Sequence, residues 1–104
     1  MRKVKVKICG LKRAQDIECV NRLLPDYIGF VFAKTKREVT EQQAAQLKAM
    51  LNPQIKAVGV FVNAEIDKII RLAKSRTIDI IQLHGDEDAS YCERLRLQTE
   101  LPII

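Results

Sequence analysis

The stretch KVKICGLKR, residues 5–13, contains the pattern that decides the fold. Alternating apolar and polar residues over 4–9 indicate a β-strand, Gly10 then allows the chain to turn, and a helix-prone segment begins at Arg13. The strand ends on Cys9, so a thiol stands where the chain leaves the strand. Residues 5–13 therefore predict a strand that leads into a helix, with a reactive side chain at the junction.

The same unit recurs along the rest of the chain. Short β-rich segments alternate with segments in which apolar residues recur every three or four positions. The expected strands are 4–9, 27–32, 57–62 and 78–84, and the expected helices are 13–24, 40–51, 64–76 and 88–97. This alternation predicts a parallel sheet with right-handed crossovers. A fifth strand is expected to begin at 101–104, so the chain is interpreted as the front part of something larger.

Polar residues mark the expected helix starts. Thr40 with Gln43 fits a capping box, in which each side chain bonds to the other residue's backbone N–H. Asn63 is placed to cap the third helix, and Asp86 or Asp88 to cap the fourth.

The faces of the first and fourth strands distinguish two α/β architectures. Side chains alternate across a strand, so each of these strands has one apolar face and one face that becomes polar toward its C-terminal end. An open sheet covered by helices on both sides would be apolar on both faces. A barrel has helices only on the outside and can carry polar residues at its inner, C-terminal rim. The pattern therefore favours a barrel over an open, receiver-like sheet.

In a barrel, Cys9, Gln82 and His84 are expected to converge at one mouth, with Lys7 one layer below Cys9. A lysine ammonium favours the thiolate form of a nearby cysteine, so Cys9 is a candidate base or nucleophile. A buried, inert cysteine and a hydrogen-bonded structural histidine remain open alternatives.

The other cysteines and the acidic run suggest structural roles. Cys19 and Cys92 fall on helix stripes and are expected in the core. The run GDED, residues 85–88, could bind a metal, but acidic residues at a helix N-terminus explain it more simply. The three cysteines form no CxxC pair, which argues against a disulfide framework or a zinc site and indicates a reduced, cytoplasmic protein.

Composition limits the classes of partner. The 104 residues are 47% hydrophobic and 30% charged, as expected for one globular unit, and they contain no apolar run long enough for a membrane span. The net charge of +5 is either a solvated surface or an attraction for an anionic ligand. Nucleic acid is a less favoured partner because no aromatic residues are interleaved with the basic ones.

Four motifs in order, KICGLKR, IGFVFAKTKREV, VGVFVN and IQLHGDE, closely resemble phosphoribosylanthranilate isomerase of tryptophan biosynthesis. The resemblance covers essentially the whole chain and implies a TIM (βα)8 barrel, of which residues 1–104 would be a half-barrel with four βα units and the start of strand five. It implies an isomerase that carries out an Amadori rearrangement without cofactor or metal. The general acid, an aspartate at the end of the sixth strand, and the phosphate site in the loops after the seventh and eighth strands would lie in an absent C-terminal half, so the fragment alone is expected to be inactive.

The resemblance also implies roles for individual residues. Cys9 would be the general base, and Arg37 would pair with the anthranilate carboxylate of the substrate. Gln82 and His84 would line the site, while Lys7 and Gly10 would support it. Thr35 stands where the family usually has a serine, two positions before the arginine, and the loop is about one residue shorter.

Two rival functions and one assembly state stay open from the sequence. The chain could be a non-catalytic basic module that binds an anionic partner, or another phosphate-binding barrel enzyme. A half-barrel would leave its edge strands unpaired, which predicts a homodimer through those edges.

Overall fold

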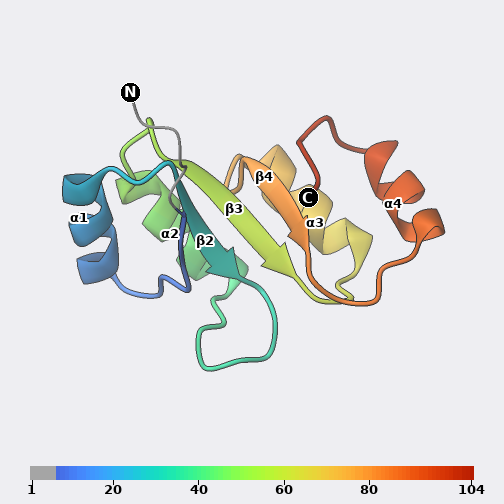
Figure 1. The fold of residues 1–104 in the computed structure, drawn as a ribbon, viewed down its shortest axis with the longest axis horizontal. Helices are drawn as coiled ribbons and strands as arrows, with labels where there is room; N and C mark the ends of the chain where they lie inside the picture. Colours follow the sequence, from blue (N-terminus) through green and yellow to red (C-terminus); the bar gives the residue numbers. More distant parts are fainter. Residues whose placement is uncertain (1–6) are drawn as a thin grey trace.

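The computed structural model describes residues 7–104, which form four strands and four helices in alternation (Figure 1). The elements are β1 (Lys7–Cys9), α1 (Ala14–Leu23), β2 (Tyr27–Val31), α2 (Glu41–Met50), β3 (Lys56–Phe61), α3 (Ile66–Lys74), β4 (Ile80–Leu83) and α4 (Ala89–Arg96). Their ends agree with the expected ranges to within two residues, except that the start of the first strand, 4–6, lies outside the described residues.

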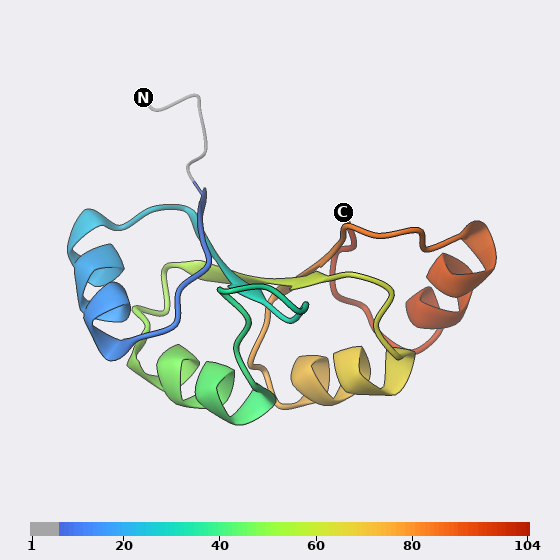
Figure 2. The ribbon, with the colours of Figure 1, turned by 90° about the horizontal axis from the view of Figure 1, so that it is seen from below.

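The four strands form one parallel sheet in the order β1-β2-β3-β4. Because each crossover leads to the next strand in the same direction, right-handed connections place the helices on the same face. Figure 2 shows the described helices along the convex side of the curved sheet. This arrangement confirms the expected part of a barrel and is not that of an open sheet with helices on both sides.

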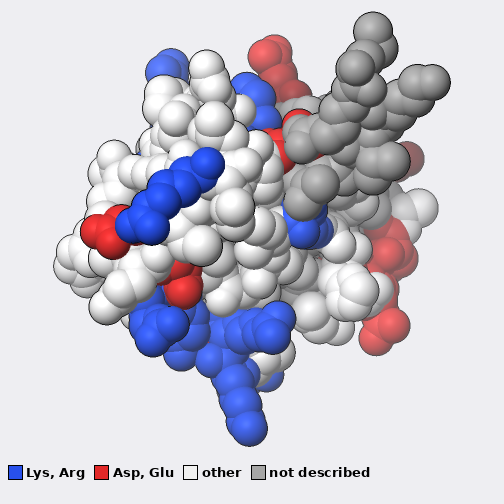
Figure 3. Space-filling model, turned by 60° about the vertical axis from the view of Figure 1, so that its left-hand side comes forward, with Lys and Arg blue, Asp and Glu red and all other residues white. Residues whose placement is uncertain are grey.

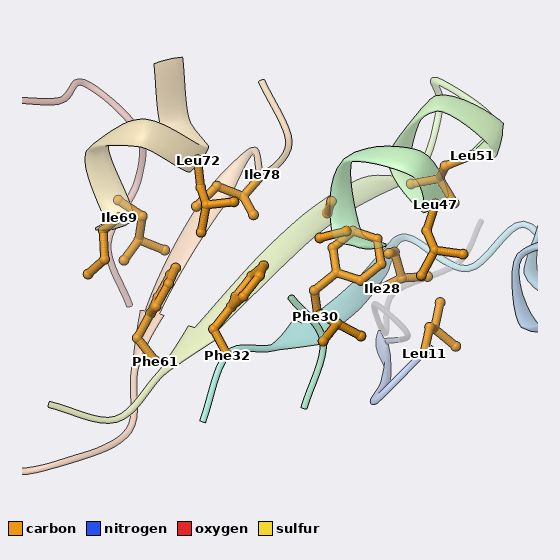
Figure 4. Close-up of a cluster of buried hydrophobic side chains, with 14 of the residues drawn as sticks. Leu11, Ile28, Phe30, Phe32, Leu47, Leu51, Phe61, Ile69, Leu72 and Ile78 are labelled. Carbon is orange, nitrogen blue, oxygen red and sulfur yellow. The ribbon is translucent and has the colours of Figure 1, made fainter. Parts of the chain in front are cut away.

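The core lies between the convex face of the sheet and the helices. Ile28 and Phe30 of β2, Phe61 of β3 and Ile81 of β4 are fully buried there. Figure 4 shows side chains of α2 and α3 directed onto these strands, and the rings of Phe32 and Phe61 stack with centroids 5.2 Å apart. These side chains therefore point outward to the helices, and the opposite, concave face carries the candidate site.

The helix starts confirm two of the expected caps and correct a third. Thr40 and Gln43 form the capping box, with the Thr40 hydroxyl accepting from the Gln43 N–H at 3.0 Å. Asp88 caps α4 by accepting from the N–H of Tyr91 at 2.8 Å. The expectation for Asn63 was wrong: α3 begins after Glu65, and Asn63 takes a left-handed backbone with φ 49°.

Two cysteine placements also differ from expectation. Cys19 is exposed, because the buried stripe of α1 runs through Ile17 and Val20 and leaves Cys19 on the outer side. Cys92 is only half-buried, since α4 buries Leu95 alone. The expected core role is therefore wrong for Cys19 and only partly met by Cys92.

The last four residues return to the sheet, as expected for the start of a fifth strand. Ile103 forms a parallel bridge with Ile81 of β4. The N–H groups of Ile81 and Leu83 donate to the carbonyls of Pro102 and Ile104, both at 2.9 Å. Within residues 7–104, β1 forms one edge of the sheet and this segment lies along the other.

Candidate active site

Cys9 lies at the carboxyl end of β1, on the concave face of the sheet. Its register partner on β2 is Gly29, and the N–H of Gly10 donates to the Gly29 carbonyl at 2.9 Å. A Cβ placed on Gly29 would lie only 2.5 Å from the Cys9 sulfur. The thiol therefore occupies space that exists because β2 has a glycine at this position, and Cys9 remains solvent-exposed.

Arg37 comes from the loop between β2 and α2 and reaches the same end of the sheet. A Cβ placed on Gly10 would lie 2.5 Å from Cδ of Arg37, so the arginine stem passes directly over the residue after Cys9. Gly10 also has φ +85°, a conformation that side chains rarely allow. The Thr35 hydroxyl accepts from the Arg37 N–H at 3.1 Å and helps to shape the loop. The Cys9 thiol and the Arg37 stem, which passes over Gly10, therefore both lie at the carboxyl end of β1.

Lys7 and Gln82 meet across the concave face, where the Lys7 ammonium donates to the Gln82 amide oxygen. The register places Cys9 level with Gly29, Val58 and Ile80, so Gln82 lies two residues farther along its strand. Because strands in a barrel are staggered, residues at the same mouth need not be level with one another in the ladder. The ladder places Lys7 level with Lys56 and Gln82 level with Val60, so the long Lys7 side chain reaches across the strands and farther along the sheet to Gln82.

His84 follows β4 at the same rim and is exposed. Its N–H donates to the Phe61 carbonyl at 2.8 Å, which extends the pairing of β3 and β4 by one step. Gln82 lies on the concave face of β4, and His84 follows that strand on the same face. Cys9 lies in β1, at the far side of the sheet from β4. Within residues 7–104, the structure shows no contact between the His84 imidazole and the Cys9 thiol.

Glu87 ties the loops after β3 and β4 together. Its carboxylate accepts from the N–H of Asn63 at 2.8 Å and from that of Gly85 at 2.9 Å, while the Asn63 side chain accepts from the Asp86 N–H at 3.0 Å. Partial burial acts to raise the pKa of Glu87, but backbone hydrogen bonds and the nearby His84 outweigh it and lower the pKa. This network fixes the rim beside His84.

Two of the three carboxylates in residues 85–88, those of Glu87 and Asp88, have structural partners. Glu87 binds backbone N–H groups and Asp88 caps α4, which supports the helix-start interpretation of the acidic run. In the part of the chain that the structure describes, no cluster of three or more His, Cys, Asp or Glu residues could hold a metal ion. The described helices also include none that is long and apolar enough to cross a membrane.

Basic side chains gather near the loops at the carboxyl ends of β1 and β2. The Lys12 ammonium donates to the Lys36 carbonyl at 3.0 Å, which joins the two loops, and Lys34, Lys36 and Arg37 are exposed. Figure 3 shows a group of Lys and Arg side chains at the lower end of the molecule, the end to which the loop after β2 extends in Figure 1. This surface suits an anionic ligand.

Sequence reasoning did not identify Gly29 or Lys12 as parts of this rim. A glycine inside a strand often marks a close approach of another group, so the sequence did contain a signal for Gly29. Lys12 gave no comparable signal, because its contact depends on how two loops are placed relative to each other.

Comparison with known proteins agrees with this geometry. Residues 6–104 match the family model described as N-(5'phosphoribosyl)anthranilate (PRA) isomerase. The chain is 48% identical over 101 residues to N-(5'-phosphoribosyl)anthranilate isomerase of Lachnoclostridium phytofermentans, an alignment that covers 97% of this chain and 46% of that protein. The chain thus spans about half the length of the curated relatives it matches.

Solved structures give the same result. Monomers generated from the dimeric phosphoribosylanthranilate isomerase of Thermotoga maritima superimpose with a TM-score of 0.85 at 34% identity, covering 97% of this chain and 51% of that one. A phosphoribosyl anthranilate isomerase in complex with reduced 1-(o-carboxyphenylamino)-1-deoxyribulose 5-phosphate gives a TM-score of 0.83 at 33% identity, covering 97% of this chain and 52% of that one.

Proposed function

Since the chain belongs to the phosphoribosylanthranilate isomerase family, we propose that the protein carrying it converts N-(5-phosphoribosyl)anthranilate to 1-(2-carboxyphenylamino)-1-deoxyribulose 5-phosphate. This Amadori rearrangement changes an aldose derivative into a ketose derivative and belongs to tryptophan biosynthesis. The observation that carries the proposal is that the Cys9 thiol and the Arg37 side chain lie at the same end of β1, with the arginine stem over Gly10.

The chemistry requires one acid and one base. Protonation of the furanose ring oxygen opens the ring to a protonated Schiff base. Removal of the C2 proton then gives an enol, which becomes the ketone. We assign the removal of the C2 proton to the Cys9 thiolate, which is exposed on the concave face where a substrate can reach it.

The basic rim fits the charges of the substrate. We assign the anthranilate carboxylate to Arg37, whose guanidinium can hold both carboxylate oxygens in parallel hydrogen bonds. Gln82 and His84 would line the site on the β4 side, and Lys7 would hold Gln82 in place through their hydrogen bond.

We further propose that residues 1–104 act as a half-barrel within the eight-stranded unit of the family. The general acid and the phosphate site would come from the half of the barrel that these residues do not cover. The enzyme would work in the cytoplasm on a small phosphorylated substrate, without cofactor, nucleic acid or membrane. A basic binding module and another phosphate-binding barrel enzyme are less favoured, because the family model matches nearly the whole chain.

The test is conversion of N-(5-phosphoribosyl)anthranilate by the protein purified at the full length of its reading frame, followed by chromatography. Cys9→Ala should lower kcat by about 10²- to 10⁴-fold, the usual contribution of a general base. Cys19→Ala is the matched control, since that thiol is exposed on α1 away from the strand ends, and it should leave kcat unchanged. Wild-type turnover in the Cys9→Ala variant would refute the assignment.

A further inference from the structure

We propose that Gly29 is a positioning residue for the Cys9 thiol: the missing side chain at Gly29 sets the rotamer from which the thiol acts. The proposal rests on the function proposed for Cys9. Gly29 itself would not touch the reacting atoms. It would act only through the space that it leaves on the concave face of β2.

The first step is the steric relation between the two residues. Cys9 and Gly29 are direct partners in the parallel ladder of β1 and β2, and their Cβ directions lie on the same face. A Cβ on Gly29 would lie 2.5 Å from the Cys9 sulfur but 3.4 Å from Cα and Cβ of Cys9. The sulfur is therefore the atom that an added methyl group would displace.

The second step is that the backbone cannot move apart to relieve the overlap. Gly29 pairs with Val58 of β3 on one side, and its carbonyl accepts from the Gly10 N–H on the other. Both Gly29 and Val58 are buried in the middle of the sheet. A shift of β2 would break ladder hydrogen bonds, whereas rotation of the Cys9 side chain breaks none of these.

The third step is the size of the displacement. Staggered rotamers of a cysteine side chain place its sulfur roughly 3 Å apart. A misplacement of about 1 Å can already cost about 100-fold in rate when a catalytic group loses its alignment. Gly29→Ala should therefore lower kcat by about 100-fold or more, with a much smaller change in KM, because the residues that hold the substrate are unchanged.

A double-mutant cycle separates positioning from a general structural role. If Gly29 acts through the thiol, Gly29→Ala should lower kcat in the wild-type protein but not further in Cys9→Ala. Melting temperatures of the same variants give a second double-mutant cycle, which does not require the protein to be enzymatically active. The added methyl group should lower it with Cys9 present and have a smaller effect in Cys9→Ala, where no sulfur is in the way.

Gly59→Ala is the matched control. Gly59 lies in β3 on the convex face, where a Cβ would lie 2.9 Å from the Phe61 ring and 3.0 Å from Ile78. Such overpacking lowers stability without reaching the site, so Gly59→Ala should lower the melting temperature by several degrees and leave kcat within about threefold of wild type.

The measurements are kcat, KM and melting temperature of the full-length protein for wild type, Cys9→Ala, Gly29→Ala, the double variant and Gly59→Ala. The proposal would be overturned if the fold-loss of kcat in the double variant equals the product of the two single-variant losses. A kcat within about threefold of wild type in Gly29→Ala would overturn it as well. If the wild-type protein does not convert the substrate, the proposed function fails, and the melting-temperature cycle still decides whether Gly29 and the thiol are coupled. Equal melting-temperature losses in both backgrounds would then overturn the coupling.

Discussion

Substitution of Gly10 tests whether the path of Arg37 over the end of β1 matters for substrate binding. Gly10 has φ +85°, and an added Cβ would lie 2.5 Å from Cδ of Arg37 and 3.3 Å from both Cγ and Nε. Two separate effects are therefore expected from Gly10→Ala: backbone strain, which affects stability, and displacement of the arginine, which affects binding.

The magnitudes of the two effects differ in origin. A non-glycine residue in the left-handed region costs about 1–2 kcal/mol, which sets the expected loss in unfolding free energy. The overlap adds little to this loss, because Arg37 is exposed and its side chain can rotate away. Rotation would remove the charge-assisted contact proposed between Arg37 and the substrate carboxylate, and such a contact is worth about 1.5–3 kcal/mol. That loss corresponds to a rise in KM of roughly 10- to 100-fold.

Gly10→Asn provides the matched comparison. Asparagine adopts the left-handed region more readily than alanine, so its stability loss should be smaller. Its Cβ occupies the same position, so its effect on KM should be as large as that of alanine. Urea unfolding gives the free energies, and initial rates with N-(5-phosphoribosyl)anthranilate give KM. A wild-type KM in both variants would refute the reasoning, because glycine would then serve the turn alone.

Three further predictions concern stability and assembly. Thr40→Ala should lower the unfolding free energy by about 1 kcal/mol by removing the cap of α2, while Thr40→Ser should stay near wild type; equal urea midpoints for all three would contradict this. Because the pKa of Glu87 is lowered in the folded state, the stabilisation that its carboxylate provides is present above about pH 4.3 and is lost as the pH falls through the folded-state pKa. In urea unfolding, the free energies of wild type and Glu87→Gln should therefore converge in acid, and a constant difference down to pH 3 would exclude this role. The 104-residue chain by itself should associate through β1 and the segment 101–104, and a monomer in sedimentation at micromolar concentration would argue against pairing of these edges.

The elements and the polar positions on the concave side of β1 and β4 could be predicted because they depend on local patterns. Alternation along the expected strand 78–84 separates Ile81 from Gln82, and the structure places Ile81 in the core and Gln82 on the other face. The capping box at Thr40 is likewise a property of four consecutive residues. Such features need no knowledge of how distant segments pack.

The stagger of the strands could not be predicted in the same way. Sequence alternation tells which face a residue occupies, but not its height relative to residues on other strands. The ladder puts Ile80 level with Cys9 and Gln82 two residues farther along, which alternation alone does not show. Asn63 was assigned to a cap for a similar reason: its actual partners, Asp86 and Glu87, belong to the loop after the next strand.

The glycines show where a local pattern and a distant contact meet. Gly10 and Gly29 could each be read from the sequence as permissive positions, one at a turn and one inside a strand. Only the structure shows what fills the space that each leaves, the Arg37 stem over Gly10 and the Cys9 sulfur beside Gly29. Because both side chains lie against backbone that is hydrogen-bonded within the sheet, their positions depend on two residues that have no side chains of their own. A search for candidate site residues by chemical type alone would therefore find Cys9 and Arg37 and overlook the two glycines beside them.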